Sequence, residues 1–172
     1  MSGRILIAGI GNIFLGDDAF GVEVVRELSA RAWPDDVRVI DFGIRGYDLA
    51  FALTDGYEAA ILVDAVARGE PPGTTYLMEI DGAEVSKLEP ENVNAHSLNP
   101  VAVLQMAHSL GGIGGKLFLV GCEPATLEPL DGQTGLSDAV RPAVTQALEL
   151  IDSLVSDLLR SNIKPTAGFK PA

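Results

Sequence analysis

Short runs of apolar residues recur along the chain and predict the strands of a sheet. The first run, 4–8, is rich in branched residues and does not alternate with polar ones, which is typical of a strand buried on both faces. Further strands are predicted at 37–40, 59–64 and 116–121. Segment 74–80 places Thr75, Leu77 and Glu79 at alternate positions, and this pattern predicts an edge strand.

Helical spacing of apolar residues between these runs predicts the helices that connect them. Phe20, Val24 and Leu28 recur at helical spacing, and we expect this helix to end near Ala32 because a proline follows. Three further helices are predicted: one at 47–53, one that starts at 99–100 and has His108 in its last turn, and one from about 137 to 159. Pro142 either begins the regular part of the last helix or kinks it.

The alternation of strands and helices predicts an α/β protein with helices on both faces of the sheet. We expect one domain over 1–160 and a flexible tail over 161–172, where the core pattern stops. Segment 81–94 is polar and lacks periodicity, which predicts a long surface loop. Loops that follow the first and third strands open at the same edge of such a sheet, and ligands bind there.

A glycine-rich corner carries two carboxylates between the first strand and the first helix. Gly9, Gly11 and Gly16 permit close approaches that side chains would block, and Asp17 is expected to cap the helix. A dinucleotide-binding motif needs a glycine three positions after Gly11, where the chain has phenylalanine. Asp17 and Asp18 would also repel a pyrophosphate at this helix end. The corner is therefore not predicted to bind a nucleotide.

Composition narrows the class of protein further. The chain has 172 residues, of which 47% are hydrophobic, enough for one domain with a full core. No apolar run approaches the ~20 residues that cross a bilayer, so no membrane partner is expected. The net charge of −12 repels phosphate backbones, and we expect no nucleic-acid partner. Cys122 is the single cysteine, which excludes an internal disulfide and agrees with a cytoplasmic location.

Asp64 is the most informative single residue. It directly follows buried apolar residues, and a carboxylate there needs a metal, a cation or several backbone donors to offset desolvation. A turn residue or helix cap is the alternative. If Asp18, Asp64 and His96 meet at one sheet edge, their oxygen and nitrogen atoms suit nickel, zinc, manganese or iron. His108, the other histidine, is assigned a structural role in the last turn of its helix.

Other catalytic arrangements have less support. Cys122 could serve as a thiol nucleophile with a histidine, but a cysteine after a core strand is more often buried as a small apolar group. The chain contains neither G-x-S-x-G nor H-E-x-x-H, so a serine hydrolase and a helix-borne zinc protease are not supported.

Four motifs resemble those of the [NiFe]-hydrogenase maturation proteases, endopeptidases that trim a C-terminal extension from the hydrogenase large subunit. The motifs lie at 9–21, 61–65, 96–98 and 119–124, and the resemblance covers roughly 4–159. It implies a three-layer α/β/α sandwich of the phosphorylase/hydrolase-like type, with a five-stranded, mostly parallel mixed sheet in which one strand is antiparallel.

The resemblance also implies that the residues contacting nickel fall on Asp18, Asp64 and His96. Asp18 stands where the family often has the longer Glu. Where the family often has D-G-G-T-x-G, segment 41–46 reads D-F-G-I-R-G, so the threonine hydroxyl is lost and Arg45 is gained. This departure suggests a different class of partner hydrogenase.

The expected function is removal of the C-terminal extension from the large-subunit precursor after nickel insertion. Asp18 and Asp64 are also the candidate catalytic residues, acting through a metal-activated water or as a general base on water. We expect the nickel to be supplied by the precursor and the protein to be a monomer. The free protein should bind divalent metal weakly, because one histidine and two carboxylates on exposed loops face the expected site and the sequence shows no cage of four ligands. The alternative is a non-enzymatic metal-sensing or ligand-binding α/β module.

Overall fold

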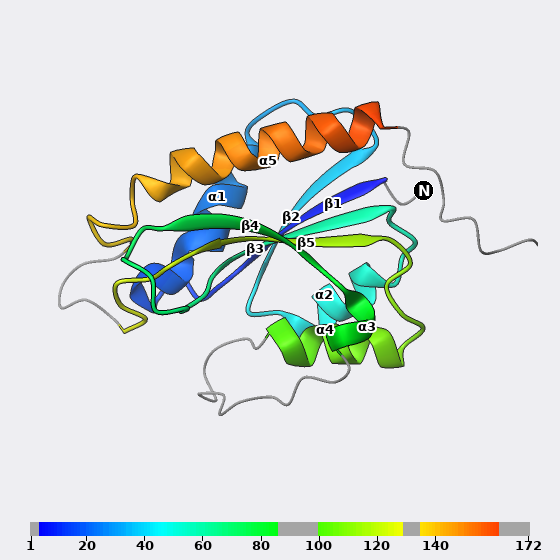
Figure 1. The fold of residues 1–172 in the computed structure, drawn as a ribbon, viewed down its shortest axis with the longest axis horizontal. Coiled ribbons are helices and arrows are strands. Elements are labelled where there is room, and N and C mark those ends of the chain that lie inside the picture. Colours follow the sequence, from blue (N-terminus) through cyan, green and yellow to red (C-terminus); the bar gives the residue numbers. More distant parts are fainter. Residues whose placement is uncertain (1–3, 86–99, 129–134, 162–172) are drawn as a thin grey trace, which may run out of the picture.

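The computed structural model describes residues 4–85, 100–128 and 135–161. Within them a five-stranded sheet lies between two layers of helices (Figure 1). The strands are β1 (Ile5–Ile10), β2 (Val37–Gly43), β3 (Ala59–Ala65), β4 (Thr75–Ile80) and β5 (Lys116–Cys122), in the spatial order β2-β1-β3-β5-β4. β4 pairs antiparallel with β5, and the other neighbours are parallel. The predicted three-layer architecture with one antiparallel strand is confirmed.

Helices from distant parts of the chain cover the two faces of the sheet. α1 (Phe20–Ser29) and α5 (Ala143–Arg160) lie on one face, and α2 (Gly46–Leu53), α3 (Gly82–Val85) and α4 (Pro100–Ser109) lie on the other (Figure 1). A short 3-10 helix, η1 (Gly16–Ala19), precedes α1. Because β1 and β3 lie inside the sheet with helices on both faces, every residue of these two strands is buried.

Alternate side chains of the central strands fill two separate hydrophobic cores. Ile5 and Ile7 of β1 belong to the core formed with α1 and α5, whereas Leu6 and Ala8 belong to the core formed with α2 and α4. This two-sided burial explains why the central strands show no alternation of apolar and polar residues. β4 lies at the edge of the sheet and is only partly buried, so the predicted edge strand is confirmed.

Several predicted boundaries were wrong. β1 runs on to Ile10 and β2 to Gly43, beyond the predicted ends at 8 and 40. α1 ends at Ser29 rather than near Ala32, and the chain then turns through hydrogen bonds to the carbonyls of Glu27 and Leu28. The short helix α3 occupies part of the segment 81–94 that was predicted to be a loop. α5 begins at Ala143 rather than at 137, because Pro142 occupies the N-cap position with φ −63°. Pro142 therefore begins the helix and does not kink it.

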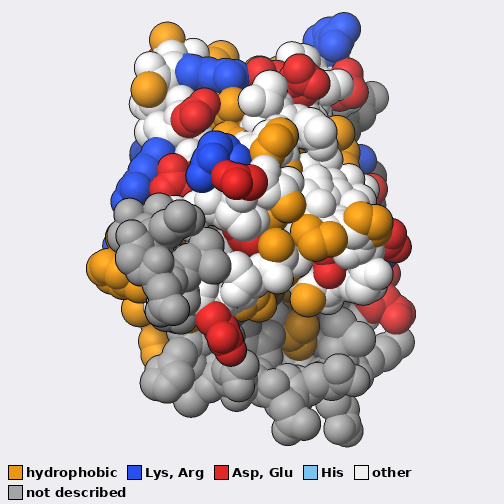
Figure 2. Space-filling view, turned by 90° about the vertical axis from the view of Figure 1, so that its left-hand side faces the viewer, with side chains coloured by type: hydrophobic (Ala, Val, Ile, Leu, Met, Phe, Trp, Pro, Cys, Tyr) orange, Lys and Arg blue, Asp and Glu red, His pale blue; other side chains and the backbone are white. Residues whose placement is uncertain are grey.

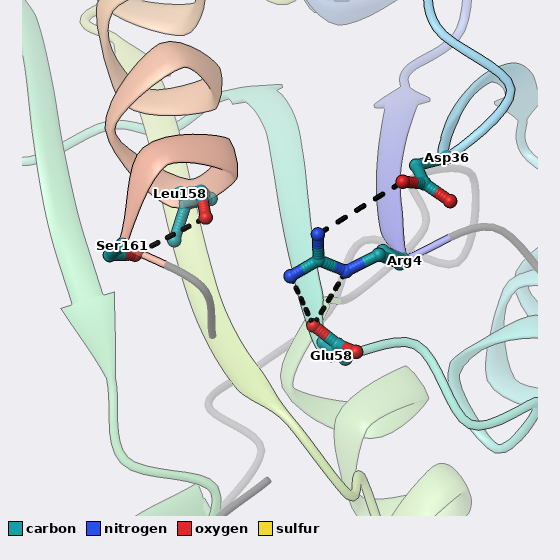
Figure 3. Close-up of polar contacts among 5 residues, drawn as sticks. All are labelled: Arg4, Asp36, Glu58, Leu158 and Ser161. Carbon is teal, nitrogen blue, oxygen red and sulfur yellow. Dashed lines mark hydrogen bonds and ion pairs between the residues drawn. The ribbon is translucent and has the colours of Figure 1, made fainter. Parts of the chain in front are cut away.

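The amino ends of the central strands are closed by charged side chains. The Arg4 guanidinium, just before β1, donates two hydrogen bonds of 2.9 and 3.0 Å to Glu58 and lies 4.0 Å from Asp36 (Figure 3). At the end of α5, which lies at the same end of the molecule, the Ser161 hydroxyl donates to the carbonyl of Leu158. The carboxyl ends of the parallel strands point the other way, toward the left side of Figure 1.

In the ranges that the structure describes, no helix is both long enough and apolar enough to span a membrane. Of the predicted tail over 161–172, only Ser161 lies within the described residues.

Candidate active site

The candidate site lies where the carboxyl ends of β1 and β3 meet. From β1 the chain crosses to β2 on one side, and from β2 it returns to β3 on the other side of β1. This change of direction leaves a crevice outside the strand ends, the usual place for a ligand in an open α/β sheet. η1 follows β1 and contacts β3, so the acidic residues of η1 lie at this crevice.

Glycines allow the backbone to fold closely over the strand ends. A Cβ added to Gly11, whose φ is +146°, would lie 1.8 Å from the carbonyl oxygen of Asp18. A Cβ added to Gly21 would lie 2.0 Å from the oxygen of Val63 and 2.3 Å from that of Ile10. The close approach at Gly11 allows η1 to fold back onto the end of β1. The close approach at Gly21 allows α1 to pack directly against β1 and β3. The predicted role of glycine in close approach is confirmed.

Asp18 enters the crevice from η1 as a buried carboxylate. It is 8% exposed, and its Oδ2 accepts a hydrogen bond of 2.8 Å from the backbone N–H of Asn12. Burial raises the pKa of Asp18, and the hydrogen bond from Asn12 opposes that rise. A carboxyl held in this way keeps a second oxygen for another partner.

Asp64 is buried more deeply, at 4% exposed, next to the end of β3. Its pKa lies well above the usual value because burial disfavours the charged form and because the charge of Asp18 lies nearby. A hydrogen bond from the backbone of Ala65 acts in the opposite direction. The structure thus brings two of the three predicted site residues together. The prediction that they lie on exposed loops was wrong, because Asp18 belongs to η1 and Asp64 to β3, and both are buried.

The third predicted site residue, His96, lies outside the described residues. In the described ranges, no three His, Cys, Asp or Glu side chains are grouped closely enough to hold a metal ion. Asp18 and Asp64 alone offer two carboxyl groups, which suit a cation that brings further ligands of its own. His108 lies in the last turn of α4, as predicted.

Asp17 does not cap α1 as predicted. No side chain caps that helix, and Asp17 instead lies fully buried with both carboxylate oxygens bonded to loops near the other end of the chain. It accepts hydrogen bonds from the backbone N–H groups of Ala125, Thr126 and Ser137 and from the Ser137 hydroxyl, at 2.7 to 3.2 Å. Asp17 therefore fastens η1 to the loop after β5 and to the segment that leads into α5.

Glu123 is a second buried anchor, and the sequence reasoning missed its role. It is 6% exposed and accepts hydrogen bonds of 2.7 Å from the N–H of Arg68 and 3.2 Å from that of Gly69. Glu123 lies just after β5 and so anchors the loop that follows β3. The signal was present, because Glu123, like Asp64, directly follows a buried apolar run.

Cys122 is fully buried. Burial and the charges of Asp17 and Glu123 raise the pKa of its thiol to about 11, so the thiolate is rare at neutral pH. The structural interpretation of this cysteine is supported, and the thiol-nucleophile alternative is not.

A cleft of about 360 Å³ lies beside the crevice, between the loops that follow β1 and β2. Its lining includes Asn12, Phe14, Asp41, Ile44 and Arg45. Phe14 is 73% exposed. The guanidinium of Arg45 folds back and donates to the carbonyls of Asp41 and Phe42, so this arginine shapes its own loop. Figure 2 views the molecule from the strand ends and shows apolar side chains among acidic and basic ones.

Several known proteins that resemble this chain in sequence or in fold are described as hydrogenase maturation proteases. The sequence model for hydrogenase maturation proteases (HycI) matches residues 22–154. A putative hydrogenase maturation protease of Methanocaldococcus jannaschii is 34% identical over 148 residues, which cover 86% of this chain and 93% of the relative. The hydrogenase 2 maturation protease of Escherichia coli is 35% identical over 147 residues, covering 84% and 88%. The solved structure of the E. coli hydrogenase maturating endopeptidase HybD superposes with a TM-score of 0.75 at 31% identity, covering 90% of this chain and 93% of that one.

Proposed function

The chain belongs to the hydrogenase maturation protease family, and from that premise we propose that it cleaves the C-terminal extension from a [NiFe]-hydrogenase large-subunit precursor. The names of its relatives support a peptidase that acts on hydrogenase. The single observation that carries the proposal is the pair of buried carboxyl groups, Asp18 and Asp64, at the crevice between β1 and β3.

This pair suits both recognition of a cation and proton transfer. Two negative charges that lie close together repel each other, and a cation that enters between them stabilises both. We propose that this cation is the nickel ion already inserted in the precursor, and that His96 is its third contact from this chain. The ion belongs to the substrate, so docking would report whether insertion has occurred.

Peptide hydrolysis needs a base for the attacking water. A carboxylate with a raised pKa is a stronger base than an ordinary one and still ionises near neutral pH when a cation is close. In the proposed reaction the water oxygen bonds to the scissile carbonyl carbon, Asp18 or Asp64 takes the water proton, and the carbon–nitrogen bond breaks. The same carboxyl group then gives this proton to the leaving amine, so one water is consumed and charge and atoms balance.

The experiment that tests the proposal is incubation of the full chain with a nickel-loaded large-subunit precursor. We expect a faster-migrating product on a denaturing gel and loss of the extension by mass spectrometry. Asp18→Asn and Asp64→Asn keep the side-chain size and remove the charge, so each should give no product. A stable complex without any cleavage by the unmodified chain would favour a non-enzymatic metal-sensing module.

A further inference from the structure

A row of three paired residues crosses the sheet at the candidate site. Asp64 of β3 pairs with Gly121 of β5, and Gly121 pairs with Tyr76 of β4. Side chains at paired positions project from the same face of a sheet. Gly121 has no side chain, and the phenol of Tyr76 occupies the space above it: an added Cβ would lie 2.3 Å from Cζ and 2.4 Å from the hydroxyl oxygen.

The phenol of Tyr76 therefore extends across β5 in the direction of Asp64. Burial raises the pKa of Tyr76, and the charges of Asp64 and Glu123 act in the same direction while Arg68 opposes them. These influences agree with a phenol that lies between the carboxylates and the arginine. Tyr76 thus forms one wall of the site beside Asp64.

Arg68 is held against this wall at two points. Its guanidinium carbon lies 4.5 Å from the centre of the Tyr76 ring, within the range of a cation–π contact. Its backbone N–H donates to the buried carboxylate of Glu123. The backbone of Arg68 is thus anchored in a loop without helix or strand structure, and its exposed guanidinium lies against the Tyr76 ring.

Arg68 does not serve as the partner of Asp64. Among the ion pairs formed within the described part of the chain, none includes Arg68. The pKa of Asp64 is raised by burial and by Asp18, whereas an adjacent guanidinium would lower it. A guanidinium has five donor N–H groups in a planar fork and matches a carboxylate well.

We propose that Arg68, positioned on the ring of Tyr76, binds a carboxylate of the precursor's C-terminal segment and so contributes to the choice of substrate. The inference rests on the proposed function. The carboxylate belongs to an acidic side chain near the scissile bond or to the free C-terminus of the precursor. Both sources present the same planar anion to the guanidinium, and substrate variants separate them.

The first test compares cleavage kinetics of nickel-loaded precursor by the full chain and its variants. Arg68→Glu should raise KM about tenfold or more and leave kcat within about twofold, because a charge-assisted hydrogen bond in substrate binding is lost. The KM of Arg68→Lys should lie between those of the unmodified protein and Arg68→Glu, since lysine keeps the charge without the planar fork. Tyr76→Phe keeps the ring and should retain the original KM. The matched control is Arg160→Glu, an exposed arginine at the far end of α5, which should change neither constant.

Substrate variants identify the carboxylate. Replacing each acidic side chain of the extension by its amide, or amidating the C-terminus, should raise KM about tenfold at one position only. That loss should vanish when the same substrate is given to Arg68→Gln, because the interaction is already absent. Equal losses with both proteins, or an unchanged KM for Arg68→Glu, would overturn the inference. So would a fall in kcat alone.

A binding measurement separates this inference from the proposed function. Fluorescence anisotropy of a labelled extension peptide with the full chain should show about tenfold tighter binding of the carboxylate form than of its amide form. Equal affinities would overturn the role of Arg68 whether or not cleavage occurs. Absence of cleavage by the unmodified chain, with this tenfold preference intact, would instead remove the proposed peptidase function alone.

Discussion

Asp64 shows how burial gives one carboxyl group its chemical character. Water is largely excluded from it, and Asp18 supplies a second negative charge nearby. Both effects favour the protonated form and raise the pKa. An acid whose pKa is higher in the folded state than in the unfolded state stabilises the fold at low pH, and this contribution is lost as pH rises through the raised value.

Asp64→Asn should therefore be more stable than the unmodified protein at pH 8. The difference should shrink toward pH 4, where the aspartic acid is protonated in the folded state. Its size is about 1.4 kcal/mol for each pH unit between the unfolded and folded pKa values. Urea unfolding at several pH values measures it. Equal stability of the two proteins across this range would show that Asp64 has no raised pKa.

Asp17 stabilises the fold through its carboxylate, in contrast to Asp64, because this carboxylate accepts hydrogen bonds from backbone groups of two loops. Asp17→Ala should lower the free energy of unfolding by about 2–4 kcal/mol, since the N–H groups of Ala125 and Ser137, which donate to this buried carboxylate, lose their acceptor. Asp17→Asn keeps one acceptor oxygen and should lose less. Thermal or urea unfolding provides the measurement. A loss below about 0.5 kcal/mol for Asp17→Ala would contradict this anchoring role.

Cys122→Ser should retain processing activity, because the thiol is fully buried and its pKa is raised. A buried hydroxyl costs stability, so the activity is compared at a temperature where both proteins are folded. Complete loss of cleavage by the folded variant would restore the thiol-nucleophile interpretation.

The residues differ in how far the sequence could predict them. Asp64 is recognisable because a charge follows an uninterrupted apolar run. The role of Asp17 is not, because its partners lie 108 to 120 positions away and meet it only in the folded chain. The contact between Arg68 and Tyr76 likewise depends on the strand register that pairs Tyr76 with Gly121, and no local sequence pattern encodes that register.

At the scale of elements, the packing of α1 against the strand ends depends on Gly21. Gly21→Ala should destabilise the protein by about 2–4 kcal/mol, because the new methyl group meets the backbone oxygens of Ile10 and Val63, which have no room to move aside. Gly82→Ala is the matched control, since nothing lies within 4 Å of an added Cβ there. Similar stabilities for the two variants in urea unfolding would contradict this close packing.

The order and type of the longer elements could be predicted from their periodicity, and their ends could not. The predicted start of α5 at 137 extended the apolar pattern across residues that turn instead, with Ser137 held by Asp17. Proline then fixed the start of the helix at the next residue. Tertiary hydrogen bonds and one rigid ring, rather than propensity, decide that boundary.

At the scale of the whole molecule, charge and site location act together. The net charge of −12 favours approach of a cation to the crevice at the strand ends. The opposite end of the sheet has its arginine paired with Glu58 and Asp36 (Figure 3). The α/β architecture could be predicted because each element carries its own apolar pattern. The fit to a precursor could not, because it depends on a second molecule.

The most direct test of the account compares nickel-loaded and nickel-free precursor, each incubated with metal-depleted protein. The two carboxyl groups are proposed to contact an ion that the substrate brings, so only the nickel-loaded precursor should be cleaved. Treating the protein with a nickel chelator before the substrate is mixed in should not reduce cleavage of the nickel-loaded precursor. Equal cleavage of both precursors would contradict recognition of substrate nickel, and cleavage only after metal is returned to the protein would indicate an ordinary metalloprotease.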